Sequence, residues 1–215
     1  MIRRVYERSI QSRLLDRVIV ATDDHRIYDQ ISTIGGEALL TSDQHANGTE
    51  RCNEVAQIED SYDYYINIQG DEPYIHPDQI DLVADLLDGQ TELATLVKAI
   101  DHLEDLDDFG EMKVVFSQQM EALYFSRSCI PHLRNIRSDM RLHHHTYYKH
   151  IGIYGYRKDV LSNIATLSPT PLESAENLEQ LRWMENGYRI KVGITDLDSQ
   201  MIDTPEDLKK LKYFE

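Results

Sequence analysis

Three acidic groups stand where the chain could support chemistry on a bound ligand. Asp23-Asp24 and Asp71-Glu72 each follow an apolar run, and Asp203 precedes a segment with helix start signals. Ligands of open parallel sheets bind beyond the carboxyl ends of the strands, so carboxylates from distant segments can meet there. Two such carboxylates could hold Mg²⁺, which prefers hard oxygen ligands and keeps phosphate oxygens in its shell. Asp is also a favoured cap and turn residue, so each carboxylate taken singly fits a structural role equally well.

The elements that would position these carboxylates alternate between strand and helix patterns. Short apolar runs such as Arg17–Thr22 are typical of strands buried on both faces, and helical stripes follow them. This alternation predicts an α/β domain with a mostly parallel sheet flanked by helices. Strands are expected at residues 17–22, 37–40, 64–68 and 189–194, and helices within 1–15, up to 33, at 49–58, from Pro77, and at 174–185 and 204–213.

The middle of the chain has a different pattern. Residues 112–116 and 122–125 flank a short polar turn, which predicts a β-hairpin, and residues 148–156 form a third strand of this group. We therefore expect a single domain over residues 1–215, with about 112–156 forming a hairpin-containing subregion.

Composition excludes several classes of partner. The chain has 215 residues, 41% of them hydrophobic, which suits one globular domain with a sizeable core. Its formal net charge of −16 argues against nucleic-acid binding, because a phosphate backbone requires Lys and Arg to release its counterions. The same charge disfavours an anionic membrane surface. A small anionic substrate is still compatible with this composition if a local basic pocket or a metal ion offsets the negative charge of the chain.

Cysteine usage and targeting signals indicate a soluble cytoplasmic protein. Cys52 and Cys129 are the two cysteines, and neither belongs to a Cys-x-x-Cys pair, so no zinc site or disulfide framework is indicated. The sequence contains no secretory signal pattern and no long apolar run.

Six phrases of the sequence resemble segments of 3-deoxy-manno-octulosonate (Kdo) cytidylyltransferases, in the family's order and over about 160 positions. Gln69-Gly-Asp-Glu-Pro73 and Asp203-Thr-Pro-Glu-Asp-Leu208 resemble the two metal-binding segments, and His45-Ala-Asn-Gly-Thr-Glu-Arg51 resembles the cytidine loop. Three further phrases resemble the segments that bind the sugar acid in the family: Tyr124-Phe-Ser-Arg127, His150–Arg157 and Leu178-Glu-Gln-Leu-Arg182. The resemblance implies a Rossmann-like nucleotidyltransferase fold, similar to that of A-type glycosyltransferases.

The resemblance also implies a role for each matching residue. Asp71 and Asp203 would bind Mg²⁺ and carry the catalytic role, and an Arg can pair bidentately with the sugar carboxylate. The nucleotide pocket would be lined by His45, Asn47, Gly48, Thr49 and Arg51, although the family more often has Ser where Asn47 stands. The sugar acid would be contacted by Gln69, Arg127, Arg134, His150, Tyr154, Glu179 and Gln180.

Structural roles compete with several of these assignments. Glu179 and Arg182 have the spacing of an exposed i,i+3 ion pair, worth a few tenths of a kcal/mol. Tyr154 and Tyr156 alternate on a strand, so at least one of the two faces is expected in the core. His143-His144-His145 falls in the least patterned stretch and is interpreted as a solvated loop.

The resemblance begins after the family's N-terminal motif. Met1–Glu7 resembles the part of the family that comes just after its first strand and an Arg/Ser/Lys loop. In the family, this loop binds the triphosphate. About 25–30 residues of the family therefore have no counterpart in this sequence. We expect slow turnover without this loop, and exposed backbone groups on the neighbours of a central strand.

The activity implied is transfer of CMP from CTP to the anomeric hydroxyl of Kdo, giving CMP-Kdo and pyrophosphate for lipopolysaccharide synthesis by a homodimer. No covalent intermediate is needed. Two alternatives remain open: a cytidylyltransferase for another acidic sugar, such as a nonulosonic acid, and a non-catalytic nucleotide- or sugar-binding remnant. The first is disfavoured by the phrases at residues 124–127 and 178–182.

Overall fold

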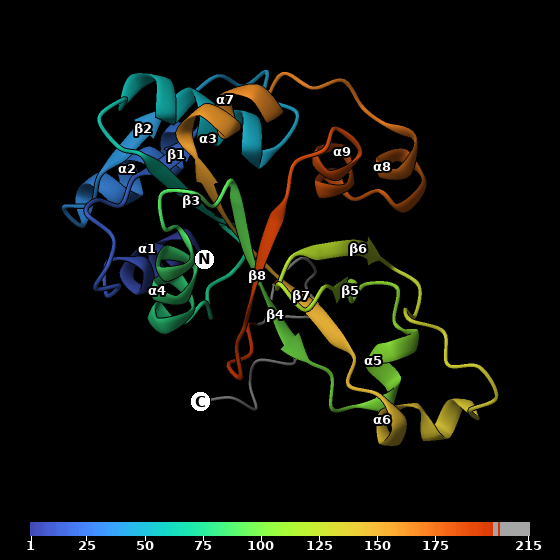
Figure 1. The fold of residues 1–215 in the computed structure, drawn as a ribbon. Coiled ribbons are helices and arrows are strands. Elements are labelled where there is room, and N and C mark those ends of the chain that lie inside the picture. The colour runs from blue at the N-terminus through green and yellow to red at the C-terminus, as the bar shows by residue number, and fades with distance from the viewer. Residues whose placement is uncertain (200–201, 203–215) are drawn as a thin grey trace.

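The computed structural model describes residues 1–199 and 202, and its elements are arranged as drawn in Figure 1. The helices are α1 (Ile2–Ser9), α2 (His25–Thr33), α3 (Gly48–Ile58), α4 (Pro77–Leu86), α5 (Leu103–Asp107), α6 (Arg141–His144), α7 (Lys158–Ile164), α8 (Pro171–Glu176) and α9 (Glu179–Glu185), with a 3-10 turn at Ser138–Met140. The strands are β1 (Val20–Thr22), β2 (Ala38–Leu40), β3 (Tyr64–Ile68), β4 (Leu93–Ala99), β5 (Lys113–Phe116), β6 (Ala122–Ser126), β7 (Tyr148–Arg157) and β8 (Ile190–Ile194).

The ten-residue strand β7 is the centre of a six-stranded sheet. Strand β4 pairs with it along one edge, from Leu93 opposite Tyr156 to Ala99 opposite Tyr148. The other edge is shared, because β3 pairs with the C-terminal half of β7 and β5 pairs at Lys149. Strand β8 extends the sheet beyond β4, and the β5–β6 hairpin extends it beyond β7.

The expected α/β architecture is confirmed, and one detail of its sheet differs. Strands β3, β4, β5 and β8 run in one direction, but β7 runs against them between β4 and the β3 and β5 strands. In the described part of the larger sheet, only β4 and β8 are hydrogen-bonded parallel neighbours. The expected mostly parallel sheet is therefore present in the direction of four of its strands, while β7 reverses between them, since a strand's direction depends on how the chain returns to the sheet.

Strands β1 and β2 form a separate parallel pair, with Val20 opposite Ala38 and Thr22 opposite Leu40. They lie with α2 on the side of the molecule occupied by α1 and α3, as Figure 1 shows. No described hydrogen-bonded ladder joins this pair to the larger sheet.

Apolar clusters cover both faces of the larger sheet. One cluster joins Leu93, Val97 and Trp183 to helix α7, and the other joins Ala94 and Leu96 to helix α4. Successive strand residues point to opposite faces, so a strand between two clusters must be apolar throughout. The continuous run of β4 meets this requirement.

Two other elements differ from the sequence expectation. A single helix over 174–185 was wrong: Asn177 adopts φ 54° and ψ 51°, and this left-handed residue separates α8 from α9. A strand at residues 93–99 was not anticipated, although it lies at the centre of the core. The helix expected at 204–213 lies outside the described residues. Within the described segments, no helix has the length and apolar character needed to cross a bilayer.

Helix α4 approaches β7 closely at Gly155. A Cβ at this position would lie 2.9 Å from both Leu87 Cδ1 and Val83 Cγ1. Val83 is fully buried, so the helix cannot retreat without opening the core. The absence of a side chain at Gly155 therefore sets the distance between the helix and the sheet.

We predict that Gly155→Ala lowers the free energy of unfolding by about 1–3 kcal/mol, because an extra methyl group overpacks the core. Gly70→Ala is the matched control, since a Cβ there would lie 3.6 Å from Ile2 Cδ1, an ordinary contact. Urea unfolding followed by circular dichroism measures both. Equal stability of the two variants would contradict the packing argument.

Candidate active site

The predicted cytidine loop leads into helix α3, whose first turn is fixed by its own polar groups. Asn47 caps the helix, because its side chain accepts a hydrogen bond from the Glu50 amide at 2.9 Å. A Cβ at Gly48 would lie 3.0 Å from Asn67 Nδ2 and 3.3 Å from Gln69 Nε2. Glycine at position 48 thus lets the start of α3 approach the end of β3.

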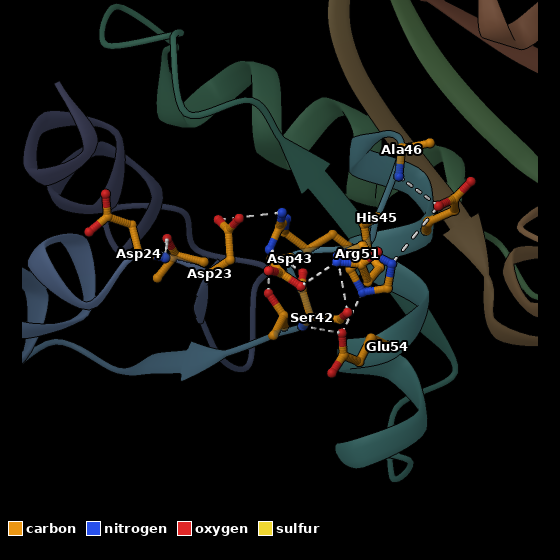
Figure 2. Close-up of polar contacts among 12 residues, drawn as sticks. Asp23, Asp24, Ser42, Asp43, His45, Ala46, Arg51 and Glu54 are labelled. Carbon is orange, nitrogen blue, oxygen red and sulfur yellow. Dashed lines mark hydrogen bonds and ion pairs between the residues drawn. The ribbon is translucent and has the colours of Figure 1, made fainter.

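Carboxylates from α3 hold His45 in place. The His45 ring contacts Glu54 through Nε2, and Nδ1 lies 3.9 Å from Glu50 Oε2 (Figure 2). The hydrogen bond with His45 is the main cause that holds the pKa of Glu54 below its usual range. The imidazole is therefore oriented by the helix that follows it.

The Arg51 guanidinium is fixed beside the ends of β1 and β2. It donates to Thr41 Oγ1 at 2.5 Å and to the Ser42 carbonyl at 3.2 Å, and Nη2 lies 3.5 Å from Asp23 Oδ1 (Figure 2). Only 22% of the side chain is exposed. In a chain of net charge −16, these contacts keep one positive charge at a defined place.

A cavity of about 980 Å³ opens beside this loop. His45, Asn47, Gly48 and Arg51 line it together with Gln69. Four of the five predicted nucleotide residues are thus brought together at one cavity, next to one predicted sugar residue. Thr49 is the fifth predicted nucleotide residue and is buried.

Asp71 follows β3, at the end of the strand that carries Asn67. The backbone amide of Ile202 donates to the Asp71 carbonyl at 2.9 Å. Asp203, the second predicted metal ligand, lies outside the described residues. Carboxylate oxygen is the ligand type that Mg²⁺ prefers, so the donor chemistry of Asp71 fits its part of the predicted pair. Within residues 1–199 and 202, no group of three or more His, Cys, Asp and Glu side chains is arranged to hold a metal ion.

His150 and Tyr154 lie buried on β7, with ring centroids 5.1 Å apart. His150 Nε2 is 2.9 Å from Thr95 Oγ1, whereas His150 Nδ1 and the Tyr154 hydroxyl have no hydrogen-bond partner among the described groups. Burial lowers the pKa of His150 to about 3 and raises that of Tyr154 well above its usual range, so both side chains are neutral at pH 7. Two unpartnered polar atoms in one buried region are costly unless something pairs with them.

A hydrogen bond joins the predicted nucleotide segment to a predicted sugar segment. Thr49 Oγ1, on α3, donates to Glu179 Oε2, on α9, at 3.1 Å. Burial raises the pKa of Glu179 to about 7. The carboxyl group is therefore divided between its neutral and charged forms near pH 7.

The other three predicted sugar residues have different surroundings. The Arg127 guanidinium donates to the carbonyls of Glu176, Phe109 and Asn177, at 2.8, 3.0 and 3.3 Å. Gln180 is buried and its Nε2 lies 3.8 Å from Met112 Sδ, whereas Arg134 is exposed. Arg127 thus connects the end of β6 to the α8–α9 junction, close in sequence to Glu179.

Sequence reasoning did not identify three residues that support this site. Glu54 orients His45, Thr95 pairs with His150, and Asn67 faces Gly48. A polar residue inside a continuous apolar strand is a usable signal, and Thr95 stands in such a run. The pairing of Glu54 with His45 depends on how the loop folds onto α3, and no spacing rule predicts it.

Comparison with known proteins relates this geometry to one family. The family model described as cytidylyltransferase matches residues 1–191. A 3-deoxy-manno-octulosonate cytidylyltransferase of Parabacteroides distasonis is 49% identical over 100% of this chain and 87% of its own, and that of Phocaeicola vulgatus is 49% identical over 100% and 86%. The solved structure of a CMP:2-keto-3-deoxy-manno-octonic acid synthetase complexed with CTP matches with a TM-score of 0.90 and 38% identity, over 99% of this chain and 86% of that one.

The raised pKa of Glu179 predicts a pH-dependent contribution to stability. From about pH 4.5, the usual value, to about pH 7, the unfolded chain has lost this proton while the folded chain keeps it. The unfolded state then binds fewer protons, so this contribution to stability falls as pH rises through that window. We expect Glu179→Gln to gain stability relative to the wild type between pH 4.5 and 7.5.

Urea unfolding of both proteins at several pH values measures the difference. His150 is present in both proteins, so the wild-type-minus-variant difference removes its separate titration. A difference that does not change with pH would show that Glu179 titrates normally in the folded chain.

Proposed function

The chain belongs to the CMP-Kdo synthetase family of cytidylyltransferases, and we propose that it transfers CMP from CTP to the anomeric hydroxyl of Kdo. The observation that carries this proposal is the hydrogen bond from Thr49 to Glu179. It joins the helix that follows the cytidine loop to the first residue of α9. A reaction between a nucleotide and a sugar acid requires these two segments to meet.

The nucleotide end of the proposed site is the loop from His45 to Arg51. His45 and the Asn47–Gly48 pair line the cavity, and the Arg51 guanidinium provides positive charge there. The contacts of Arg51 with Thr41 and Asp23 orient this charge before any ligand binds. Such preorganisation lowers the cost of ordering the side chain on binding an anionic nucleotide.

We assign the sugar end of the proposed site to β7 and α9, and we assign contacts with the sugar acid also to Gln69, Arg127 and Arg134. The unpartnered His150 Nδ1 and Tyr154 hydroxyl suit the hydroxyl groups of a sugar acid. A carboxylate would be bound by Arg127 after exchange of carbonyl partners, or by the exposed Arg134. Gln180 and Glu179 stand at the start of α9 beside this region.

Asp71 and Asp203 would hold Mg²⁺, which when bound supplies positive charge to phosphate oxygens. The carbonyl of Asp71 accepts a hydrogen bond from Ile202, the residue that precedes Asp203 in the chain, and this contact supports the pairing of the two carboxylates.

The proposed reaction is a single in-line displacement. The anomeric hydroxyl of Kdo attacks the α-phosphorus of CTP and releases its proton to solvent as the new O–P bond forms. The bond between the α-phosphorus and the oxygen that bridges the α- and β-phosphates breaks, and pyrophosphate leaves. The segments that meet at Thr49 and Glu179 serve to hold the two substrates in line, since fixed orientation replaces an entropically costly encounter. Cytoplasmic location and a homodimer, both implied by the family resemblance, stay predictions.

The proposal predicts that incubation with CTP, Kdo and Mg²⁺ yields CMP-Kdo and pyrophosphate in equal amounts. Chromatography identifies the nucleotide sugar, and a coupled assay measures pyrophosphate. Product from a nonulosonic acid but none from Kdo would replace Kdo by the alternative acidic sugar. CTP binding by calorimetry without product from either sugar would indicate a non-catalytic binding protein.

A further inference from the structure

Thr95 is a polar residue on an apolar face of the larger sheet. Leu93 and Val97, its neighbours on the same face of β4, belong to the core cluster that contains Trp183. Thr95 itself is fully buried. Valine has the same branched shape, so the packing of this face does not require a hydroxyl group at position 95. The reason for the hydroxyl has to be sought in its contacts.

The single proton of the Thr95 hydroxyl is committed to the backbone of β7. Oγ1 lies 2.7 Å from the carbonyl oxygen of Ile153 and 3.5 Å from that of Ile151. A carbonyl oxygen can only accept, so the hydroxyl donates its proton to Ile153. The ladder between β4 and β7 changes register between Thr95 and Leu96, and such irregularities re-aim side chains. The hydroxyl oxygen keeps its lone pairs for a second partner.

That second partner is His150, whose Nε2 lies 2.9 Å from Thr95 Oγ1. Because the hydroxyl proton is already used, Nε2 carries a proton and donates it to Thr95. Burial lowers the pKa of His150 to about 3, so the ring is neutral at pH 7 and has a single N–H. Nδ1 is therefore the nitrogen with the lone pair. The opposite tautomer would place two lone pairs against each other at the Thr95 contact.

Two aromatic rings hold the imidazole in this orientation. The Phe125 ring meets it edge-on, with centroids 5.5 Å apart, and the Tyr154 ring lies 5.1 Å away. His150 Nδ1 and the Tyr154 hydroxyl have no hydrogen-bond partner among the described groups. Nδ1 is thus a fixed acceptor beside a hydroxyl that can donate or accept.

We propose that Thr95 is a positioning residue for the sugar acid: it fixes the tautomer of His150 and so makes His150 Nδ1 a hydrogen-bond acceptor. The ligand in this proposal rests on the proposed function, whereas the tautomer does not. An acceptor binds a hydroxyl group, which has a proton to donate, and disfavours a carboxylate, which has none at pH 7. His150 therefore selects a hydroxyl of the sugar, and the carboxylate is left to an arginine.

Nitrogen-15 NMR of the chain labelled at histidine measures the tautomer directly, because protonated and unprotonated imidazole nitrogens have well-separated shifts. The signals of His150 are identified by their loss in His150→Gln and by nuclear Overhauser effects with the Phe125 ring. We expect a protonated Nε2 and an unprotonated Nδ1 at pH 7, both in the free chain and with saturating Kdo. A proton on Nδ1 in either state would overturn the proposal.

Thr95→Val and Thr95→Ser form a matched pair that separates the hydroxyl from the shape of the side chain. Trp183 is the only tryptophan of the sequence, its ring lies 5.0 Å from that of Tyr154, and its fluorescence is used to follow Kdo binding. Thr95→Val should weaken Kdo binding at least about tenfold, because the His150 N–H loses its acceptor, whereas Thr95→Ser should stay within about threefold of the wild type. The affinity for CTP, measured by calorimetry, should be the same in all three proteins.

Failure of this proposal and failure of the proposed function give different results. A wild-type chain that does not bind Kdo would contradict the proposed function, and with it the selection of a sugar hydroxyl by His150. Equal Kdo affinity of the wild type and a folded Thr95→Val, or an unchanged His150 spectrum in that variant, would overturn the role of Thr95 alone. If circular dichroism shows that Thr95→Val does not fold, the wild-type spectrum and the Kdo affinity of Thr95→Ser decide: a proton on Nδ1, or a tenfold loss in Thr95→Ser, would overturn the role.

Discussion

The pairing of both edges of β7 is the constraint on which the rest of the structure depends. One edge is satisfied by β4 along its length, and the other is divided between β3 and β5. Because β3 and β5 both reach this edge, the end of β3 and the hairpin subregion are tied to one strand. His150 and Tyr154 lie on that strand, so its position determines where the proposed sugar region lies relative to the nucleotide loop.

Buried polar groups then distinguish the site from the surrounding core. The region around β7 contains a neutral His150, a Tyr154 hydroxyl without a described partner and a Glu179 with a raised pKa. A core selected for stability alone would replace them with apolar side chains, because each unpaired polar atom costs about 1–3 kcal/mol. Under the proposed function, the sugar acid would supply the missing partners.

The electrostatics of the nucleotide loop are also set by local contacts. The chain is strongly acidic, yet Arg51 is held by a hydroxyl, a carbonyl and a single carboxylate at 3.5 Å. Under the proposed function, this local positive charge would bind the anionic nucleotide despite the negative charge of the whole chain. Glycine at position 48 contributes by allowing this loop to approach β3 closely.

The sequence by itself determined the helices and strands whose periodicity is local. The strand at Tyr64–Ile68, the helix from Pro77 and the hairpin around residues 117–120 match their patterns because period, caps and turns are properties of neighbouring residues. The ordered phrases also identified the family, as the match over residues 1–191 confirms. The roles of the individual site residues stay predictions.

Only the tertiary structure decided what depends on distant segments. Packing between segments far apart in the chain decided four features. These are the direction of β7, the division at Asn177 between α8 and α9, the hydrogen bond from Thr49 to Glu179, and the hydrogen bonds from Arg127 to backbone carbonyls. Such contacts leave no periodic pattern in the sequence, because they depend on which surfaces pack against each other and exclude water. A sequence pattern reports the local conformation and the burial that each residue favours. The tertiary structure decides which of these can be satisfied together.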